Sequence, residues 1–256
     1  MSSSWPAPLS VGDRVQGLDG EKATVRYVGS VDGQEGEWFG VEWDNAERGR
    51  HDGELKGRRY FDCVPAGRVA GSFLRAPKIA PRLTVLQALR SKYSPEGEED
   101  GTAPPEGEII HKVEFELVGT DKIKRTLGTL DALEKVFLPD ARIASAGPPG
   151  ELGAALGALW DLDLTGNLLS GWGEIEAVGR EIPKLTQLTL SRMPIAPPPP
   201  ALGGAAAFAA LRVLVLNSTR VSWGAVGGIV ARLPALQELH ACGNGIASLA
   251  MSEAAA

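Results

Sequence analysis

The chain of 256 residues has little cysteine, no excess of basic residues and no long apolar run. Its two cysteines, Cys63 and Cys242, lie far apart, which is typical of reduced thiols in a reducing compartment. The formal net charge is −6. This charge argues against nucleic acid as the main partner, because phosphate binding needs a basic face.

Signals for membrane insertion or export are also missing. No segment has the roughly 18 unbroken apolar residues of a spanning helix. The apolar stretch after Met193 is interrupted by Pro194 and by Pro197–Pro200. The N-terminus, Met-Ser-Ser-Ser-Trp-Pro, has neither the basic residue nor the apolar run of a secretory signal. We therefore expect a soluble protein of the cytoplasm with no membrane partner.

Motifs that carry catalysis or hold cofactors are absent from the sequence. The histidines His51, His111 and His240 are scattered, and the cysteines have no partner at ligand spacing, so we expect no metal site. There is no Gly-x-x-x-x-Gly-Lys-Ser/Thr loop for a nucleotide and no recognisable setting for a nucleophile. These absences favour a binding protein without a cofactor over an enzyme.

What the chain does contain is a concentration of aromatic residues and glycines. The pentapeptide Gly49–Gly53 reads Gly-Arg-His-Asp-Gly and is flanked by Trp38, Phe39, Trp43, Tyr60 and Phe61. Glycine allows a sharp turn or the close approach of another chain. The combination predicts a shallow aromatic groove beside a rigid loop, which suits a peptide. Trp43 and Phe61 are equally compatible with a place in the core.

Alternating apolar residues predict strands in the first third of the chain. Alternation occurs at Ala23–Val28 and at Trp38–Trp43, and a closing strand is expected near Ser72–Leu74. Residues 9–80 are thus predicted to form a small all-β barrel or sandwich after a disordered N-terminus at residues 1–8. A short helix within residues 81–93 should follow, with Thr84 as N-cap and an apolar face of Leu86, Leu89 and Tyr93.

Composition changes sharply after this helix. Residues 94–107 are acidic, rich in proline and glycine, and without apolar anchors, which predicts a flexible linker. Alternation at residues 109–118 indicates one more strand, and residues 251–256 form a short tail.

A repeat organises residues 108–250. The pattern Leu-x-x-Leu-x-Leu-x-x-Asn-x-Leu is clearest from Leu159 to Leu169 and occurs about five times, the first copy (Leu133–Ile143) being degenerate. Its second apolar position falls at residues 136, 162, 188, 214 and 239, a spacing of 26, 26, 26 and 25. This period lies in the range of leucine-rich repeats and predicts an α/β solenoid, stabilised by contacts between neighbouring units.

Details of each repeat unit can be predicted as well. Helical returns are expected at Leu169–Ile182 and along the inward stripe Val226, Ile229, Val230 and Leu233. Only Asn167 and Asn244 keep the asparagine of the repeat, so the turns holding Ala141, Met193 and Thr219 should be less regular.

The predicted concave face carries an uneven set of side chains. Its central column is Phe137, Asp163, Thr189, Val215 and His240, and Val213 lies beside Val215. Phe137 and the two valines would leave apolar area in water, which indicates a partner surface. The alternative is that the valines serve strand propensity alone.

The pentapeptide resembles the signature loop of CAP-Gly domains, usually Gly-Lys-Asn-Asp-Gly. The surroundings agree, with Gly-x-Trp-x-Gly-Val at Gly36–Val41, Arg-Tyr-Phe-x-Cys at Arg59–Cys63, and Gly71-Ser72-Phe73. Here Arg50 replaces the lysine and keeps its charge, and His51 replaces the asparagine. The resemblance implies recognition of an acidic C-terminal tail ending in Glu-Glu-Tyr/Phe, as on α-tubulin and some microtubule-end proteins. The residues it implies in tail binding are Trp38, Phe39, Trp43, Gly49, Arg50, His51, Asp52, Gly53, Tyr60 and Phe73, with Trp38 and Phe73 the strongest groove candidates.

A CAP-Gly domain followed by leucine-rich repeats resembles the tubulin-specific chaperone E (tubulin-folding cofactor E) family. Val41–Gly53, Asp163–Trp172 and Leu211–Asn217 read like that family's segments. Its members usually continue into a C-terminal ubiquitin-like domain, which this sequence does not contain, so we expect a fragment. The resemblance implies α-tubulin, other tubulin-folding cofactors and microtubules as partners.

Together these observations predict a multidomain protein that handles tubulin in the cytoplasm and cytoskeleton. In this hypothesis the groove takes the α-tubulin tail and the solenoid holds the folded body, with residues 94–107 as the tether between the two sites. The role would be assembly or dissociation of the αβ-tubulin heterodimer. The alternative is a microtubule plus-end adaptor or scaffold that uses the same groove without chaperone activity.

Overall fold

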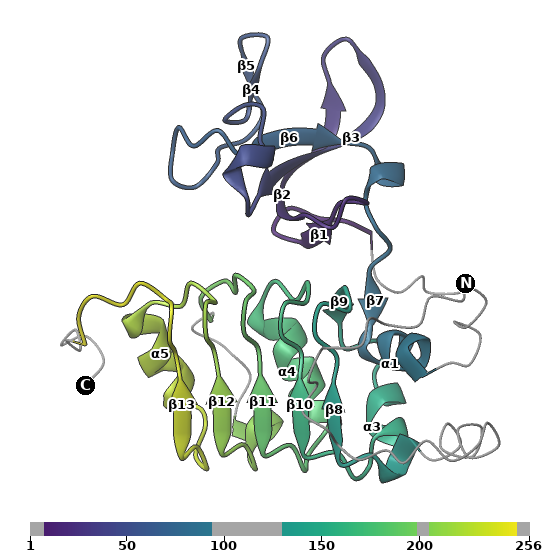
Figure 1. Cartoon of the computed structure of the whole chain (residues 1–256), viewed down its shortest axis with the longest axis vertical. Helices are drawn as coiled ribbons and strands as arrows, with labels where there is room; N and C mark the ends of the chain where they lie inside the picture. Colours follow the sequence, from purple (N-terminus) through teal and green to yellow (C-terminus); the bar gives the residue numbers. More distant parts are fainter. Residues whose placement is uncertain (1–7, 94–129, 199–204, 250–256) are drawn as a thin grey trace, which may run out of the picture.

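The computed structural model describes residues 8–93, 130–198 and 205–249 (Figure 1). The predicted N-terminus (apart from Pro8), the linker at 94–107, the strand at 109–118 and the tail at 251–256 lie outside these residues. Among the described residues, no helix combines the length and apolar character that a membrane span needs.

The first body, here called the N-terminal domain (residues 8–79), is an antiparallel sheet in the order β1-β2-β3-β6. Its strands are β1 (Arg14–Gln16), β2 (Lys22–Val31), β3 (Gln34–Trp43) and β6 (Gly71–Leu74). They confirm the strands predicted at Ala23–Val28, Trp38–Trp43 and Ser72–Leu74. A small hairpin of β4 (Glu54–Leu55) and β5 (Arg58–Arg59) and two 3-10 turns, η1 (Ala46–Arg48) and η2 (Ala76–Lys78), complete it.

The prediction for residues 9–80 is a small barrel or sandwich, and the described strands form one open antiparallel sheet. Among the named strands of the described residues, β1 pairs only with β2 and β6 only with β3, so no pair of strands closes the sheet. Closure needs a continuous ladder of hydrogen bonds around the sheet. With three and four residues, the edge strands are too short to provide one, and isolated bridges join Gly17 to Ile79 and His51 to Gly71 instead.

The N-terminal domain has two small cores, and the apolar side chains of β3 join one of them. Phe39, Val41 and Trp43 pack with Val15, Ala23 and Val25 on one side. Phe61, Cys63 and Ala70 form the second cluster. Phe61 fits because residue 40 is glycine: a Cβ there would lie 2.5 Å from Phe61 Cε1.

The segment after the N-terminal domain docks directly on the second body. Strand β7 (Leu83–Thr84) pairs in parallel with β9 (Ile143–Ser145), and helix α1 (Val85–Tyr93) follows it. The side chains of α1 that join the core of the second body are Val85, Leu86, Ala88 and Leu89. The prediction that residues 94–107 tether the two domains is therefore wrong, because the chain is anchored to the second body before that segment begins.

The second body, here called the parallel-sheet domain (residues 130–249), is built on five parallel strands in the order β13-β12-β11-β10-β8 (Figure 1). They are β8 (Lys135–Phe137), β10 (Asp161–Asp163), β11 (Gln187–Thr189), β12 (Val213–Val215) and β13 (Glu238–His240). The pairing partners Val136, Leu162, Leu188, Leu214 and Leu239 are the five positions that the repeat spacing predicts. The predicted register is confirmed.

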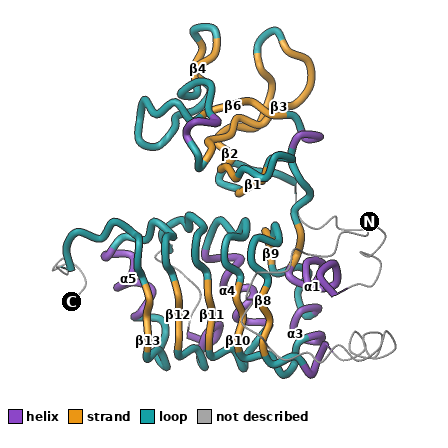
Figure 2. Tube along the Cα trace, viewed as in Figure 1, coloured by secondary structure: helices purple, strands orange, loops and turns teal. Residues whose placement is uncertain are grey.

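Segments before and between the parallel strands cover one face of the sheet (Figure 2). The returns include η4 (Leu130–Ala132), α3 (Glu151–Ala155), α4 (Trp172–Glu181), η5 (Ala205–Phe208) and α5 (Trp223–Val230). The helical returns predicted at 169–182 and around 226–233 are confirmed, with one correction. Val230, the last residue of α5, is 40% exposed rather than inward-facing.

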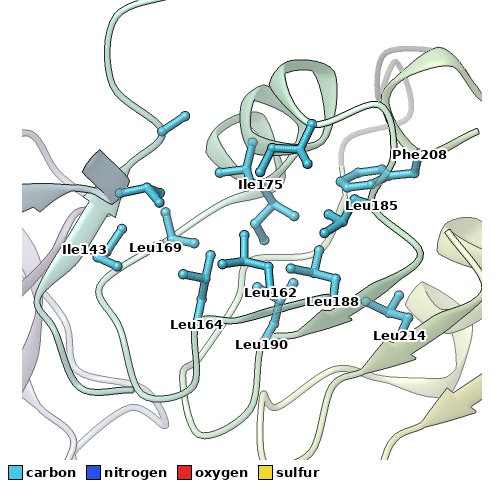
Figure 3. Packing of buried hydrophobic residues seen from close by; sticks show 14 of the residues in the cluster. Ile143, Leu162, Leu164, Leu169, Ile175, Leu185, Leu188, Leu190, Phe208 and Leu214 are labelled. Atoms are coloured by element: carbon cyan, nitrogen blue, oxygen red, sulfur yellow. The ribbon is translucent and has the colours of Figure 1, made fainter. Parts of the chain in front are cut away.

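Leucines from strands and returns fill the space between them (Figure 3). Leu162 and Leu188 of adjacent strands lie side by side, with Ile175 of α4 and Phe208 of η5 above them. No unit buries its own apolar face, so the core is continuous from α1 to Leu233.

The turns after the strands are stacked by backbone hydrogen bonds. Asp140, Gly166, Arg192 and Ser218 each donate their N–H to the carbonyl of the following unit, at 2.8 Å in every case. The prediction of less regular turns where asparagine is missing is therefore wrong for this ladder. Asn167 adds bonds from its side chain to the carbonyls of Leu138 and Leu164 and accepts one from the Ile143 N–H.

Polar contacts join the two bodies near the first strands of the parallel sheet. Lys22 at the start of β2 donates to Asp140 Oδ1 at 2.5 Å and to the carbonyl of Gly166. Asp140 also accepts from Arg192 at 2.7 Å. Arg82 in the connecting segment pairs with Asp13 at 3.1 Å.

Candidate peptide-binding groove

The Gly49–Gly53 loop is held against strand β6. The Arg50 N–H donates to the Gly71 carbonyl at 2.8 Å, and the Gly71 N–H donates to the His51 carbonyl at 2.7 Å. A Cβ on Gly49 would lie 2.3 Å from Ala70 Cα. Gly53 has φ +106°, and a Cβ there would lie 1.9 Å from the carbonyl oxygen of Phe61. Both positions therefore require glycine, for close approach and for a left-handed backbone.

His51 is fixed inside the loop. Its Nδ1 accepts a hydrogen bond from the Gly53 N–H at 3.0 Å, which requires the neutral ring with its proton on Nε2. Burial lowers the pKa of His51, while the charge of Asp52 opposes that shift. The ring is therefore neutral at physiological pH and presents an N–H donor rather than a positive charge.

An aromatic cluster packs against His51 of the Gly49–Gly53 loop. The ring of Phe73 on β6 lies with its centroid 5.2 Å from His51, 5.3 Å from Tyr60 and 5.6 Å from Phe61. Edge-to-face arrangements predominate in the cluster, which is the favoured geometry of aromatic pairs. The loop thus rests on a rigid apolar base.

A groove of about 580 Å³ opens beside this loop. Its aromatic walls are Trp38, Trp43 and Phe73, and its cationic side chains are Arg48, Arg50 and Lys78. The single acidic residue in its lining is Asp19. Within the described residues, Arg50 and Lys78 form no ion pair. The groove is therefore apolar along its walls and carries uncompensated positive charge, which suits an anionic peptide with an aromatic residue.

Polar atoms without partners mark the same place. Trp38 Nε1, Trp43 Nε1 and Ser72 Oγ are buried, belong to lining residues and make no hydrogen bond within the described residues. Buried donors are normally satisfied, so the groove lining has hydrogen-bonding capacity that the described protein groups do not use.

The residues predicted for tail binding fall into three groups in the structure. Trp38, Trp43, Arg50, His51 and Phe73 line the groove. Gly49 and Gly53 shape the loop, while Asp52 is held by Arg59 at 2.9 Å on its outer side. Phe39 and Tyr60 lie elsewhere: Phe39 is 5% exposed in the core, and the Tyr60 hydroxyl accepts from the Asp32 N–H.

Sequence reasoning missed Arg48, Lys78 and Asp19. These side chains come from three separate segments that only the fold brings together. Arg48 directly precedes the recognised loop, and this position is the one feature of the sequence that could have identified it as a groove residue.

The residues predicted on the concave face do share one surface. Phe137 is 40% exposed, while Val213 and Val215 are half-buried on β12. Asp163 and Thr189 are half-buried as well, and His240 is exposed beside Glu238.

On strand β10, next to the edge strand β8, Asp161 is nearly covered. Burial raises the pKa of its carboxyl, and the Lys135 ammonium, 3.8 Å away, acts in the opposite direction.

In the described part of the chain, no group of three or more histidine, cysteine or carboxylate side chains is placed to hold a metal ion.

Comparisons with known proteins give one match to the N-terminal domain and further matches to nearly the whole chain. Residues 11–79 match the family model of the CAP-Gly domain. A Xenopus laevis protein named tubulin-specific chaperone E is 37% identical over 232 residues, covering 90% of this chain and 43% of that protein. The tubulin-folding cofactor E of Arabidopsis thaliana is 36% identical over 248 residues, covering 93% of this chain and 45% of that protein.

Among solved structures, the CAP-Gly domain in human Kinesin-like protein KIF13B is 34% identical with a TM-score of 0.27, covering 33% of this chain and 85% of that one. The chain spans less than half the length of the two chaperone-type relatives.

Proposed function

We propose that this homologue of tubulin-specific chaperone E, with its N-terminal CAP-Gly domain, is a tubulin-folding cofactor of the cytoplasm and cytoskeleton. It acts by binding and not by catalysis, together with other tubulin-folding cofactors, in assembly or dissociation of the αβ-tubulin heterodimer. The observation that carries this proposal is the cationic, aromatic-walled groove in the N-terminal domain.

In this proposal the groove takes the acidic C-terminal tail of α-tubulin. The terminal aromatic side chain packs between Trp38 and Phe73, and carboxylates pair with Arg50, whose guanidinium forms a planar fork. The indole N–H of Trp38, which has no partner among the described residues, supplies a donor for the peptide. Terminal carboxylate capture by backbone and side-chain donors is an established recognition mode for peptides.

The parallel-sheet domain is proposed to be a leucine-rich repeat solenoid that holds the folded body of tubulin. Support comes from its strand spacing and from the apolar side chains Phe137, Val213 and Val215 on the outward face of the strands. Because β7 and α1 anchor the chain to this domain, the two binding surfaces are joined through residues 80–82 and not through a long tether. A short connection gives the second contact a high effective concentration.

Tail binding is tested by titrating the full chain with a peptide ending in Glu-Glu-Tyr and with the same peptide lacking the tyrosine. Loss of the tyrosine and the Arg50→Gln substitution are each expected to weaken binding about tenfold, since both remove a central contact. Arg58→Gln is the matched control, because Arg58 is exposed on the same domain and pairs with Asp32 outside the groove. Equal affinity for both peptides would refute the groove assignment.

Co-sedimentation separates a folding cofactor from a microtubule-end adaptor. The full chain is expected to bind soluble αβ-tubulin and to stay in the supernatant of polymerised microtubules. Val213→Glu with Val215→Glu should weaken capture of the heterodimer while leaving tail-peptide affinity unchanged, because these residues lie on the other domain. A chain that pellets with microtubules and ignores the heterodimer is an adaptor.

A further inference from the structure

One carboxylate of the protein itself already occupies part of the groove. Asp19 and Arg48 both line it, and Asp19 Oδ2 lies 2.5 Å from one terminal nitrogen of Arg48 and 2.7 Å from Arg48 Nε. Both side chains are only partly covered, with 41% of Asp19 and 34% of Arg48 exposed. The pair is therefore within reach of a ligand in the groove.

The guanidinium of Arg48 is held in place independently of Asp19. Its Cζ lies 4.6 Å from the ring centroid of Trp43, a fully buried side chain that also lines the groove. The cation–π contact fixes the planar group over the ring and leaves its edge available for a carboxylate. Replacing one carboxylate by another on that edge does not require Arg48 to move.

The environment of Asp19 agrees with an ionised side chain. Partial burial acts to raise the pKa of its carboxyl, but hydrogen bonds from Arg48 and from the Glu21 N–H, with the charge of Arg48, lower it overall. Asp19 follows Gly17 and Leu18 in a short turn, closed by the bond from the Gly20 N–H to the Gly17 carbonyl. The carboxylate therefore stands on a turn outside the strands.

The three cations of the groove differ in one respect. Arg48 has an internal carboxylate, whereas Arg50 and Lys78 have none among the described residues. An acidic peptide entering the groove meets two uncompensated cations and one that Asp19 already neutralises.

We propose that Arg48 is a second carboxylate-binding residue of the groove. It pairs with Asp19 in the free protein and with an acidic side chain of the peptide in the complex. This inference rests on the proposed function and assigns to the same groove a further specificity residue. Arg50 and the loop receive the peptide's C-terminal end, and Arg48 receives an acidic residue upstream of it.

The exchange has two consequences for recognition. Binding breaks one ion pair and forms another, so the upstream carboxylate gains less than it would from an unoccupied arginine. Asp19 therefore lowers the affinity for a peptide with two acidic residues and, by its negative charge, excludes peptides that cannot displace it.

The test is calorimetric titration of the full chain with four peptides: one ending in Glu-Glu-Tyr, one with each glutamate in turn replaced by glutamine, and one with both replaced. Asp19→Asn is expected to tighten binding of the Glu-Glu-Tyr peptide about threefold, the scale of one partly exposed ion pair. Arg48→Gln is expected to weaken it about fivefold. One of the two singly substituted peptides lacks the glutamate that Arg48 binds. For that peptide, neither Asp19→Asn nor Arg48→Gln should change the affinity.

A double-variant cycle removes the effect of net charge. If Asp19 acts through Arg48, Asp19→Asn gains nothing in the Arg48→Gln background, whereas a general field effect persists there. Asp32→Asn is the matched control, because Asp32 carries the same charge in an exposed pair with Arg58 outside the groove.

The outcomes separate the two proposals. No binding of the Glu-Glu-Tyr peptide by the unmodified chain overturns the proposed function, and this inference with it. Binding that Asp19→Asn and Arg48→Gln leave unchanged, or that they change equally for all four peptides, overturns the exchange alone.

Discussion

The protonation state of His51 controls a hydrogen bond that holds the groove loop in place. Its Nδ1 accepts the Gly53 N–H, so protonation of the ring removes a hydrogen bond that holds the loop. Burial lowers the pKa of His51 below the ordinary 6.5, against the opposing charge of Asp52. The folded state therefore prefers the neutral ring, and the unfolded chain takes up a proton at higher pH than the folded chain does.

We predict a pH dependence of stability that traces to this residue. As pH falls through 6.5, the unfolded state gains a proton first, so stability is lost until the pH lies below the lowered pKa of folded His51. The melting temperature of the chain should drop more between pH 7.5 and 5.5 than that of His51→Asn. Identical pH profiles for the two proteins would show that the ring is already free to titrate.

Which of the groove residues the sequence revealed depends on their spacing along the chain. Trp38, Arg50 and His51 lie in one continuous motif, so composition and loop chemistry were sufficient to single them out. Asp19 and Lys78 lie in other segments, and the ion pair with Arg48 forms only when the sheet brings residue 19 beside residue 48. Phe39 was misplaced because period-two alternation does not tell which side of a two-core sheet is the groove.

At the scale of elements, helix α1 begins with a reciprocal cap. The Gln87 N–H donates to Thr84 Oγ1 at 3.2 Å, and the Thr84 N–H donates to Gln87 Oε1 at 2.9 Å. This is the capping-box arrangement with glutamine at its third position. Thr84 is also the last residue of β7, so the cap fixes the point where the chain turns from the strand into the helix.

Thr84→Ala is predicted to loosen α1 without unfolding the domain. It removes the hydroxyl acceptor, which costs about 1 kcal/mol at a helix N-terminus. Hydrogen-exchange mass spectrometry should show about fivefold faster exchange in a peptide covering residues 85–93. Thr84→Ser, which keeps the hydroxyl, should exchange like the unmodified chain, and equal rates in all three proteins would contradict a role for the cap.

The strands of the parallel-sheet domain were predictable because their pattern is periodic, whereas the docking of α1 was not. A spacing of 26 residues forces Leu162, Leu188 and Leu214 into register, since any slip would expose them. The apolar face of α1, in contrast, indicates only that the helix packs against another part of the protein, without identifying which part. Its partner, the first edge of the parallel sheet, follows from β7 pairing with β9.

At the scale of the whole molecule, the relation between the two bodies rests on few contacts. Lys22 is 19% exposed and bonds both Asp140 and the carbonyl of Gly166, so one side chain spans from the N-terminal domain to two units of the other. Partial burial acts to raise the pKa of Asp140, but Lys22 and Arg192 together lower it overall. Asp140 therefore keeps its charge, and the contact holds down to mildly acidic pH.

Lys22→Ala should release the relative orientation of the two bodies while leaving each folded. Small-angle scattering is expected to show a larger radius of gyration and a broader distance distribution, with the melting behaviour changed little. Arg192→Ala is the matched control: Arg192 pairs with the same Asp140 but lies within the parallel-sheet domain, so its loss removes a charge pair without crossing between the bodies.

Tubulin binding provides a second measurement on the Lys22→Ala variant. If tail and body of tubulin are bound together, a loosened orientation lowers the effective concentration of the second contact. Lys22→Ala should then bind the isolated tail peptide as tightly as the unmodified chain and the αβ-tubulin heterodimer several-fold more weakly. Scattering curves that superimpose, or heterodimer binding that stays unchanged although the curves differ, would mean that Lys22 does not set the geometry used for capture.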